Sequence, residues 1–124
     1  EVTACNERTV AALERAGLKT LSAEGEINPL YKLSYSEDKA SIALSSKLFD
    51  DSINPSSDFA AVMTCSHAEE NCPFVAGADQ RIALTYEDPK AFDDSPEEAQ
   101  AYDRRCAQIA REMFYVFKTA QNGN

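Results

Sequence analysis

Long apolar runs are missing from this sequence, and so is the dense cysteine of a disulfide-stapled scaffold. No apolar stretch approaches the roughly 20 residues of a membrane-spanning helix, and none resembles a signal peptide. Four cysteines among 124 residues are too few for a small secreted framework. These absences favour a cytoplasmic protein whose cysteines are either buried or chemically active.

Positive charge is also scarce. The chain has 12 basic and 21 acidic residues, which give a formal net charge of -9. Such a chain repels nucleic acid and anionic membrane surfaces, so neither is expected as a partner. At this length one core can bury roughly two-thirds of the surface of the unfolded chain. Residues 1–124 are therefore predicted to form a single domain.

Histidine occurs once, and no glycine-rich phosphate loop is present. His67 is the single candidate base for a Ser/His/Asp or Cys/His mechanism, and a surface or helix-capping role is its plainer interpretation. Two cysteines also have plain interpretations. Cys5 can pack against Val10 as a hydrophobic staple, and Cys106 lies on the apolar face of a predicted helix.

Helices are predicted near both ends of the chain. Asn6 is a good N-cap for a helix that runs to about Ala16, and Gly17 suits the position after its end. Ser95 and Glu98 match a capping box that opens a long second helix. The apolar positions of that helix recur at spacings of three and four and predict one buried stripe: Ala99, Tyr102, Cys106, Ile109, Met113, Val116 and Phe117.

Strands are predicted in the middle of the chain. Residues 31–35 and 41–48 alternate partly around a polar turn, which indicates a β-hairpin, whereas residues 18–28 show no clear period. Residues 59–64 are continuously apolar apart from their last residue, as in a strand of a parallel sheet that is covered on both faces. A further strand is predicted over residues 81–86.

Cys65 and Asp88 each follow one of these last two strands. Parallel strands end at the same edge of a sheet, where open α/β sheets bind ligands. If the two strands are parallel, Cys65 and Asp88 face one crevice. Pro89 restricts Asp88 to extended geometry, and a rigid carboxylic acid at this position could protonate a leaving group. A turn or cap is the plainer interpretation of Asp88.

Cys65 and Cys72 are the most informative pair in the sequence. On one regular helix their Cα atoms would lie about 10 Å apart, whereas a disulfide needs roughly 4.4 to 6.8 Å. Oxidation of the pair therefore requires a looped or unwound segment between them. From spacing alone, three interpretations stay open: two unconnected buried thiols, a redox pair, or a metal site made with His67.

Two segments together carry a family resemblance. Residues 59–73, with Cys-x6-Cys-Pro, and residues 86–93, with Asp88-Pro89, resemble the low-molecular-weight protein tyrosine phosphatase superfamily, and most closely its thioredoxin-coupled arsenate reductases. The similarity extends over most of the chain. It implies an α/β fold with three layers and a mainly parallel sheet, to which the hairpin near 31–48 would be an insertion. No cofactor or metal is expected.

The resemblance also implies roles for the site residues. Asp88 would be the general acid toward the leaving oxygen of an oxyanion or phosphomonoester substrate. Cys65 would attack the family's nucleophilic cysteine, Cys72 would resolve the resulting disulfide, and a thioredoxin-like protein would reduce the Cys65–Cys72 bond.

The family's nucleophile loop, Cys-x5-Arg, is missing from this chain. The residues six positions after the four cysteines are Ala11, Asn71, Ala78 and Glu112. Since the chain starts at Glu1 and not at Met, we expect the C-terminal part of such a protein, without its first strand and phosphate loop and inactive alone. An open sheet edge would then favour dimerisation or retention of the missing segment. The alternative is a non-catalytic redox-sensing or partner-binding module of the same fold.

Overall fold

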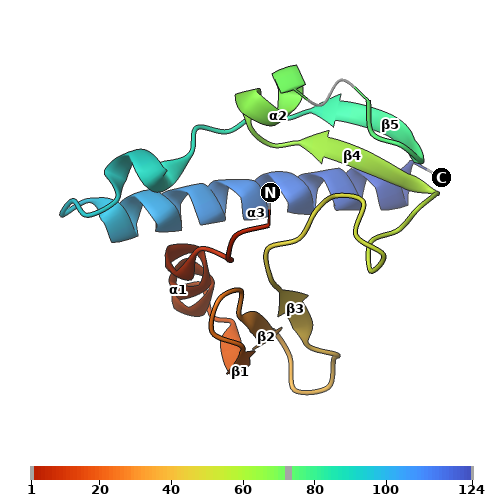
Figure 1. The fold of residues 1–124 in the computed structure, drawn as a ribbon. Coiled ribbons are helices and arrows are strands. Elements are labelled where there is room, and N and C mark those ends of the chain that lie inside the picture. Colours follow the sequence, from red (N-terminus) through yellow and green to blue (C-terminus); the bar gives the residue numbers. More distant parts are fainter. Residues whose placement is uncertain (1, 72–73, 124) are drawn as a thin grey trace. The chain divides into compact units, whose positions relative to one another are not determined.

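The computed structural model describes residues 2–71 and 74–123 and shows a mixed α/β protein (Figure 1). The chain divides into two compact units. One is formed by Lys47–Asp88, here called the 47–88 unit. The other, here called the terminal unit, is formed by Val2–Ser46 together with Pro89–Asn124. The assignment of the whole chain to one domain stays a prediction.

The first helix of the terminal unit, α1, spans Glu7–Arg15. Asn6 is its N-cap, as predicted: its backbone is extended, and its side-chain oxygen accepts a hydrogen bond of 2.9 Å from the backbone N–H of Arg8. Gly17 has a φ of +111°, which favours glycine, so the chain leaves the helix where the sequence indicated.

A three-stranded antiparallel sheet follows, with strand order β1-β2-β3. Its strands are Lys19–Glu24 (β1), Leu30–Ser34 (β2) and Ile42–Leu44 (β3). The predicted hairpin is confirmed as β2 and β3. The first strand was missed because the pairing register shifts between Thr20 and Ser22, and such an irregularity breaks the two-residue alternation that marks a strand.

The long C-terminal helix, α3, spans Glu98–Asn122 and follows the short 3-10 helix η1, Pro89–Phe92. The predicted capping box is wrong, since Glu97 occupies the N-cap position without a side-chain cap. The Ser95 hydroxyl instead donates to the carbonyl of Phe92 at 2.6 Å. The Glu98 carboxylate accepts a hydrogen bond of 2.7 Å from the backbone N–H of Asp94. It also forms an ion pair with Arg8 of α1.

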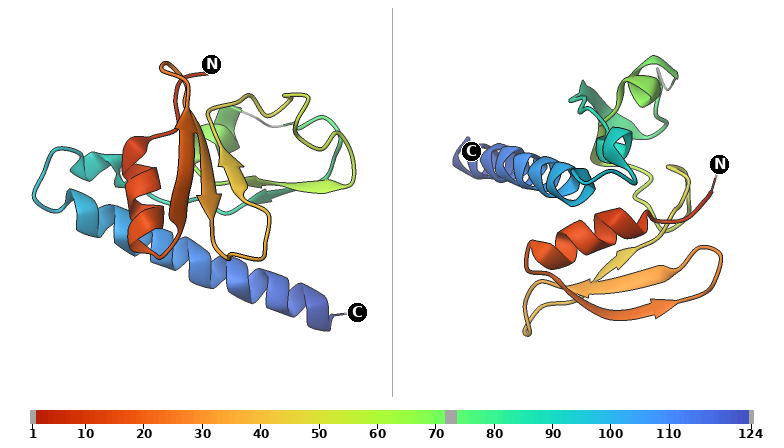
Figure 2. Two further views of the ribbon diagram at one scale, coloured as in Figure 1. Left: turned by 90° about the horizontal axis from the view of Figure 1, so that it is seen from below. Right: turned by 90° about the vertical axis from the view of Figure 1, so that its left-hand side faces the viewer.

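The predicted buried stripe of α3 is only partly buried. Tyr102 is buried, but Val116 and Phe117 are 47% and 66% exposed. The 25 residues of α3 make a rod of about 37 Å, whereas the nine residues of α1 make one of about 14 Å. Figure 2 shows α3 running on beyond α1. A helical period therefore indicates which side of α3 is apolar, but the neighbouring element decides how much of it is covered.

The 47–88 unit contains a parallel pair of strands, β4 (Phe59–Met63) and β5 (Ala78–Ala83), with the helix α2 (Ser66–Asn71) between them in sequence. The parallel pairing was predicted, but β5 begins three residues earlier than expected. Backbone hydrogen bonds prolong the pairing past β5, since Leu84 donates to Met63 and Tyr86 donates to Thr64.

The expected three-layer, mainly parallel sheet is not what the described residues form. They form two small sheets, and only the β4–β5 pair is parallel. Val62 and Ile82 pair with each other and are 40% and 42% exposed, so this pair is not covered on both faces. The continuous apolar run at 59–63 correctly predicted a strand of a parallel pair, but it does not determine how many strands the sheet contains. The mixed α/β class is confirmed.

Candidate functional site

Cys65 lies between the end of β4 and the start of α2, and it is half-buried. Its Sγ accepts a hydrogen bond of 3.4 Å from the backbone N–H of Ala68, and its carbonyl accepts one of 3.0 Å from the N–H of Glu69. The thiol therefore caps the first turn of α2.

Asp88 lies at the same edge of the parallel pair as Cys65. The hydrogen bond from the Tyr86 N–H to the Thr64 carbonyl is 2.9 Å long. Cys65 and Asp88 are one and two residues beyond this bond, in the segments that follow β4 and β5. Asp88 is exposed and directly precedes Pro89, the first residue of η1. The parallel pairing on which the expected crevice of Cys65 and Asp88 depends is present, and their roles as site residues stay a prediction.

Cys72 and the neighbouring Pro73 fall outside the described residues, so the Cys65–Cys72 pair stays a prediction. His67 is exposed on α2, where its Nδ1 lies 3.2 Å from the side-chain nitrogen of Asn71. Asn71 also donates to the His67 carbonyl at 2.8 Å. These contacts fit the surface or capping role of His67. Within 2–71 and 74–123, no group of three or more His, Cys, Asp or Glu side chains could hold a metal ion.

An ion pair between Arg81 on β5 and Glu69 on α2 was missed by sequence reasoning. The guanidinium approaches both carboxylate oxygens, with Nη1–Oε1 at 3.1 Å and Nη2–Oε2 at 2.9 Å. Nη2 also donates to the Glu69 carbonyl at 2.5 Å. The two side chains are 24% and 34% exposed. The available signal was an arginine inside a strand-like segment, which requires a partner when half-buried.

An apolar hollow of about 390 Å³ adjoins β4. Among the described residues that line it, none has a charged side chain, and they include Phe49, Pro55, Phe59, Met63 and Val75. Binding of a phosphate or arsenate oxyanion requires positive charge or converging donors. The hollow therefore suits an apolar group and does not supply an oxyanion site.

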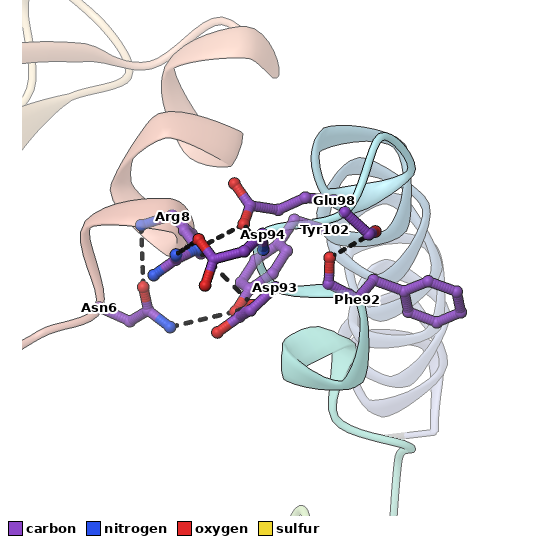
Figure 3. Close-up of polar contacts among 8 residues, drawn as sticks. Asn6, Arg8, Phe92, Asp93, Asp94, Glu98 and Tyr102 are labelled. Atoms are coloured by element: carbon purple, nitrogen blue, oxygen red, sulfur yellow. Dashed lines mark hydrogen bonds and ion pairs between the residues drawn. The ribbon is translucent and has the colours of Figure 1, made fainter.

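A second polar cluster lies in the terminal unit, where α1 meets the start of α3 (Figure 3). Arg8 Nε lies 2.7 Å from Glu98 Oε2 and 3.6 Å from Asp93 Oδ1, and its Nη2 lies 3.0 Å from Asp94 Oδ1. The hydrogen bond to Glu98 is the main cause that raises the pKa of Arg8 above its ordinary value. The same bond, helped by the Asp94 N–H, lowers the pKa of Glu98.

Tyr102 completes this cluster. Its hydroxyl donates to Asp93 Oδ1 at 2.8 Å and accepts from Asn6 Nδ2 at 3.1 Å. The residues of the cluster thus bind one another, and they join α1, the turn after η1, and α3. We interpret the cluster as a structural clamp.

Two other cysteines belong to the terminal unit. Cys5 and Cys106 are both half-buried, and burial raises the pKa of the Cys5 thiol. A raised pKa leaves less of the reactive thiolate at neutral pH. These properties agree with the packing role predicted for Cys5.

Comparison of the chain with known protein families, with curated proteins and with solved structures found no match. Among the helices of the described residues, none has both the length and the apolar character needed to cross a membrane.

Proposed function

We propose that this chain is the C-terminal part of an arsenate-reductase-like or protein-tyrosine-phosphatase-like protein, with Asp88 as general acid and Cys65 and Cys72 as a redox pair. The observation that supports this most is the shared edge. A half-buried thiol and a carboxyl group lie one and two residues beyond the last hydrogen bond of a parallel strand pair. The sequence resemblance assigns chemistry to the same two residues.

The proposed relay transfers two electrons. In the complete protein, a cysteine of the Cys-x5-Arg loop would bind the arsenic, and attack by Cys65 on that sulfur would release arsenite as the As(V) centre gains an electron pair. Cys72 would then attack the new disulfide and free the first cysteine. A thioredoxin-like dithiol in the cytoplasm would reduce the Cys65–Cys72 bond and become a disulfide itself. In a phosphatase, the same thiols would protect the nucleophile from overoxidation.

Asp88 would supply the proton of the first step. Pro89 holds the backbone of Asp88 away from helical geometry, and Asp88 is exposed to solvent. A carboxylic acid in this position would protonate the leaving oxygen of a phosphomonoester or arsenate. Its replacement by asparagine in the complete protein should reduce turnover by roughly 10²- to 10⁴-fold.

The redox pair is tested by treating the protein with mild peroxide and mapping its thiols by mass spectrometry. Two thiols and one peroxide molecule should give one disulfide, between Cys65 and Cys72, and two water molecules. Cys5→Ser and Cys106→Ser serve as matched controls and should leave this product unchanged. If Cys65 and Cys72 never form a mutual disulfide, the reductase assignment is wrong.

A non-catalytic module that senses oxidation or binds a partner is the second candidate. Large apolar side chains that are exposed in the 47–88 unit favour it: Phe49 is 61%, Ile53 70% and Phe74 77% exposed. The β4–β5 pair also leaves open strand edges among the described residues, and such edges recruit a second copy or another segment. A Cys-x5-Arg encoded upstream of Glu1 would favour the enzyme, and its absence would favour the module.

A further inference from the structure

We infer that Arg8 and Tyr102 are positioning residues for Asp88, because they fix the short segment that follows this residue in the chain. Nothing in the sequence resemblance assigns a role to either of them. The inference rests on the proposed function, since it concerns the residue proposed as general acid. It is carried by the contacts that join the turn after η1 to α1 and α3.

A single helical turn separates Asp88 from this cluster. Asp88 is bonded directly to Pro89, the first residue of η1, and η1 ends at Phe92. The backbone N–H of Asp93 then donates to the Lys90 carbonyl at 3.0 Å and ties the following turn to η1. A hydrogen-bonded 3-10 turn has few free backbone rotations. Contacts that fix its end therefore also restrict its start.

Two side chains hold Asp93 at the end of η1 (Figure 3). The Tyr102 hydroxyl donates to Asp93 Oδ1 at 2.8 Å, and Arg8 Nε lies 3.6 Å from the same oxygen. Asn6 orients this hydroxyl, because its side-chain nitrogen donates to the Tyr102 oxygen at 3.1 Å. Tyr102 is buried, and the side chains of Arg8 and Asp93 are only 28% and 29% exposed. Asp93 is thus bound from α1 and from α3.

The next residue, Asp94, has a left-handed backbone with a φ of +61°. This conformation is uncommon outside glycine and persists where the surrounding structure enforces it. Arg8 Nη2 lies 3.0 Å from Asp94 Oδ1, and Glu98 accepts from the Asp94 N–H at 2.7 Å. The path of the chain between η1 and α3 is therefore specified by contacts, as is common for strained residues near functional sites.

A general acid needs such a restriction. Proton transfer requires that the carboxyl group reaches the leaving oxygen within hydrogen-bond distance, and small displacements reduce the rate strongly. Asp88 is exposed, and an exposed side chain depends on its backbone for a defined position. Pro89 limits the backbone of Asp88 directly, and the cluster fixes the far end of η1. Loss of the cluster should therefore release Asp88 together with η1.

The test measures the backbone order of Asp88 in the intact chain by NMR relaxation of its amide. We expect an order parameter of about 0.85 in the unaltered chain and below about 0.6 in Arg8→Gln, the values of rigid and flexible backbone. Tyr102→Phe should lower the order parameter by a smaller amount, because Arg8 still binds Asp93 and Asp94.

A matched control separates positioning from a general loosening of the fold. Arg15, the last residue of α1, also joins α1 to α3, since its Nε lies 2.8 Å from Asp103 Oδ1. Arg15→Gln changes the net charge as Arg8→Gln does and should leave the order of Asp88 unchanged. Arg8→Lys keeps the charge and should recover part of the order. If Arg8→Gln fails to fold by circular dichroism, Tyr102→Phe decides the question.

Failure of this inference and failure of the proposed function give different results. Equal order of Asp88 in the unaltered chain, Arg8→Gln and Tyr102→Phe overturns the positioning role and leaves the general acid standing. An equal loss of order in Arg15→Gln also overturns it. Full turnover by Asp88→Asn in the complete protein overturns the general acid, and with it the catalytic purpose of the positioning, whatever the order of Asp88.

Discussion

Tyr102 joins three segments of the terminal unit through one hydroxyl group. It is 5% exposed and belongs to α3, while its two partners, Asn6 and Asp93, precede α1 and follow η1. Burial of a hydroxyl that both donates and accepts costs little free energy, because hydrogen bonds within the protein replace those it made with water. The sequence indicated that Tyr102 is buried but did not reveal its partners.

Replacement of Tyr102 by phenylalanine should lower the free energy of unfolding by about 1–2 kcal/mol, since the side chains of Asn6 and Asp93 then lose a partner. Urea unfolding followed by circular dichroism measures the change. Tyr115→Phe is the matched control, because Tyr115 is 71% exposed, and it should be close to neutral. Equal stability of the two variants would show that the Tyr102 bonds contribute nothing net.

Glu98 makes the stability of the folded chain depend on pH in the acidic range. Its pKa in the folded protein is lowered from 4.5, mainly by the hydrogen bond from Arg8. The unfolded chain therefore binds the proton more readily, and the stabilisation is complete above about pH 4.5 and is lost as the pH falls through the lower, folded value. Glu98→Gln should weaken this acid dependence in pH-series unfolding experiments, and an unchanged dependence on pH would contradict this account of Glu98.

The residues at the shared sheet edge could be found from the sequence, but the ion pair between α2 and β5 could not. Cys65 and Asp88 were identified because each follows a strand-like segment. Glu69 and Arg81 are 12 positions apart, and only the return of the chain as β5 brings them together. Sequence position alone therefore indicated Cys65 and Asp88 as candidate site residues and missed the ion pair between Glu69 and Arg81.

The connection into β5 depends on one glycine. Gly77 has a φ of +82°, and a Cβ at this position would meet the carbonyl oxygen of Ser56. The turn brings the chain from the α2 segment into β5, whose first residue, Ala78, donates to the Val75 carbonyl at 3.2 Å. Both the left-handed backbone and the close approach exclude a side chain there.

Gly77→Ala should destabilise the chain by about 2 kcal/mol or more, because strain and a backbone clash add together. Gly123→Ala is the control, since Gly123 has a φ of -85° and no neighbour closer than 3.4 Å. Thermal unfolding by circular dichroism distinguishes the two variants. A Gly77→Ala protein as stable as the Gly123→Ala protein would contradict this account of the turn.

The start of α3 shows how tertiary contacts override a local capping pattern. Ser95 and Glu98 have the correct spacing for a capping box, and an isolated peptide would be expected to use it. In the folded chain, Arg8 from α1 binds Glu98 at 2.7 Å, and Ser95 closes the turn after η1. A bond between two charged groups thus competes with the local cap for the same carboxylate, which also accepts from the Asp94 N–H.

For the chain as a whole, we predict no turnover of p-nitrophenyl phosphate or arsenate. None of its cysteines is followed six positions later by arginine, and the described residues that line the apolar hollow beside β4 include no cationic side chain. Steady-state assays at high protein concentration test this directly. Turnover that disappears in Cys65→Ser would show that the chain has its own nucleophile and would overturn the proposed division of labour.

Local signals in the sequence were enough for α1, for the β2–β3 hairpin, for the parallel β4–β5 pair and for the common edge of Cys65 and Asp88. These features depend on periodicity, caps and strand ends, which neighbouring residues specify. The pairing of β1, the exposed end of α3, the Arg8 cluster and the Arg81–Glu69 contact were decided only in the folded chain. The Arg8 cluster joins residues about 90 positions apart, and the other features depend on register, on the return of the chain and on which neighbours cover a helix. Geometry and burial in the folded chain set the energy of such contacts, and no local pattern encodes them.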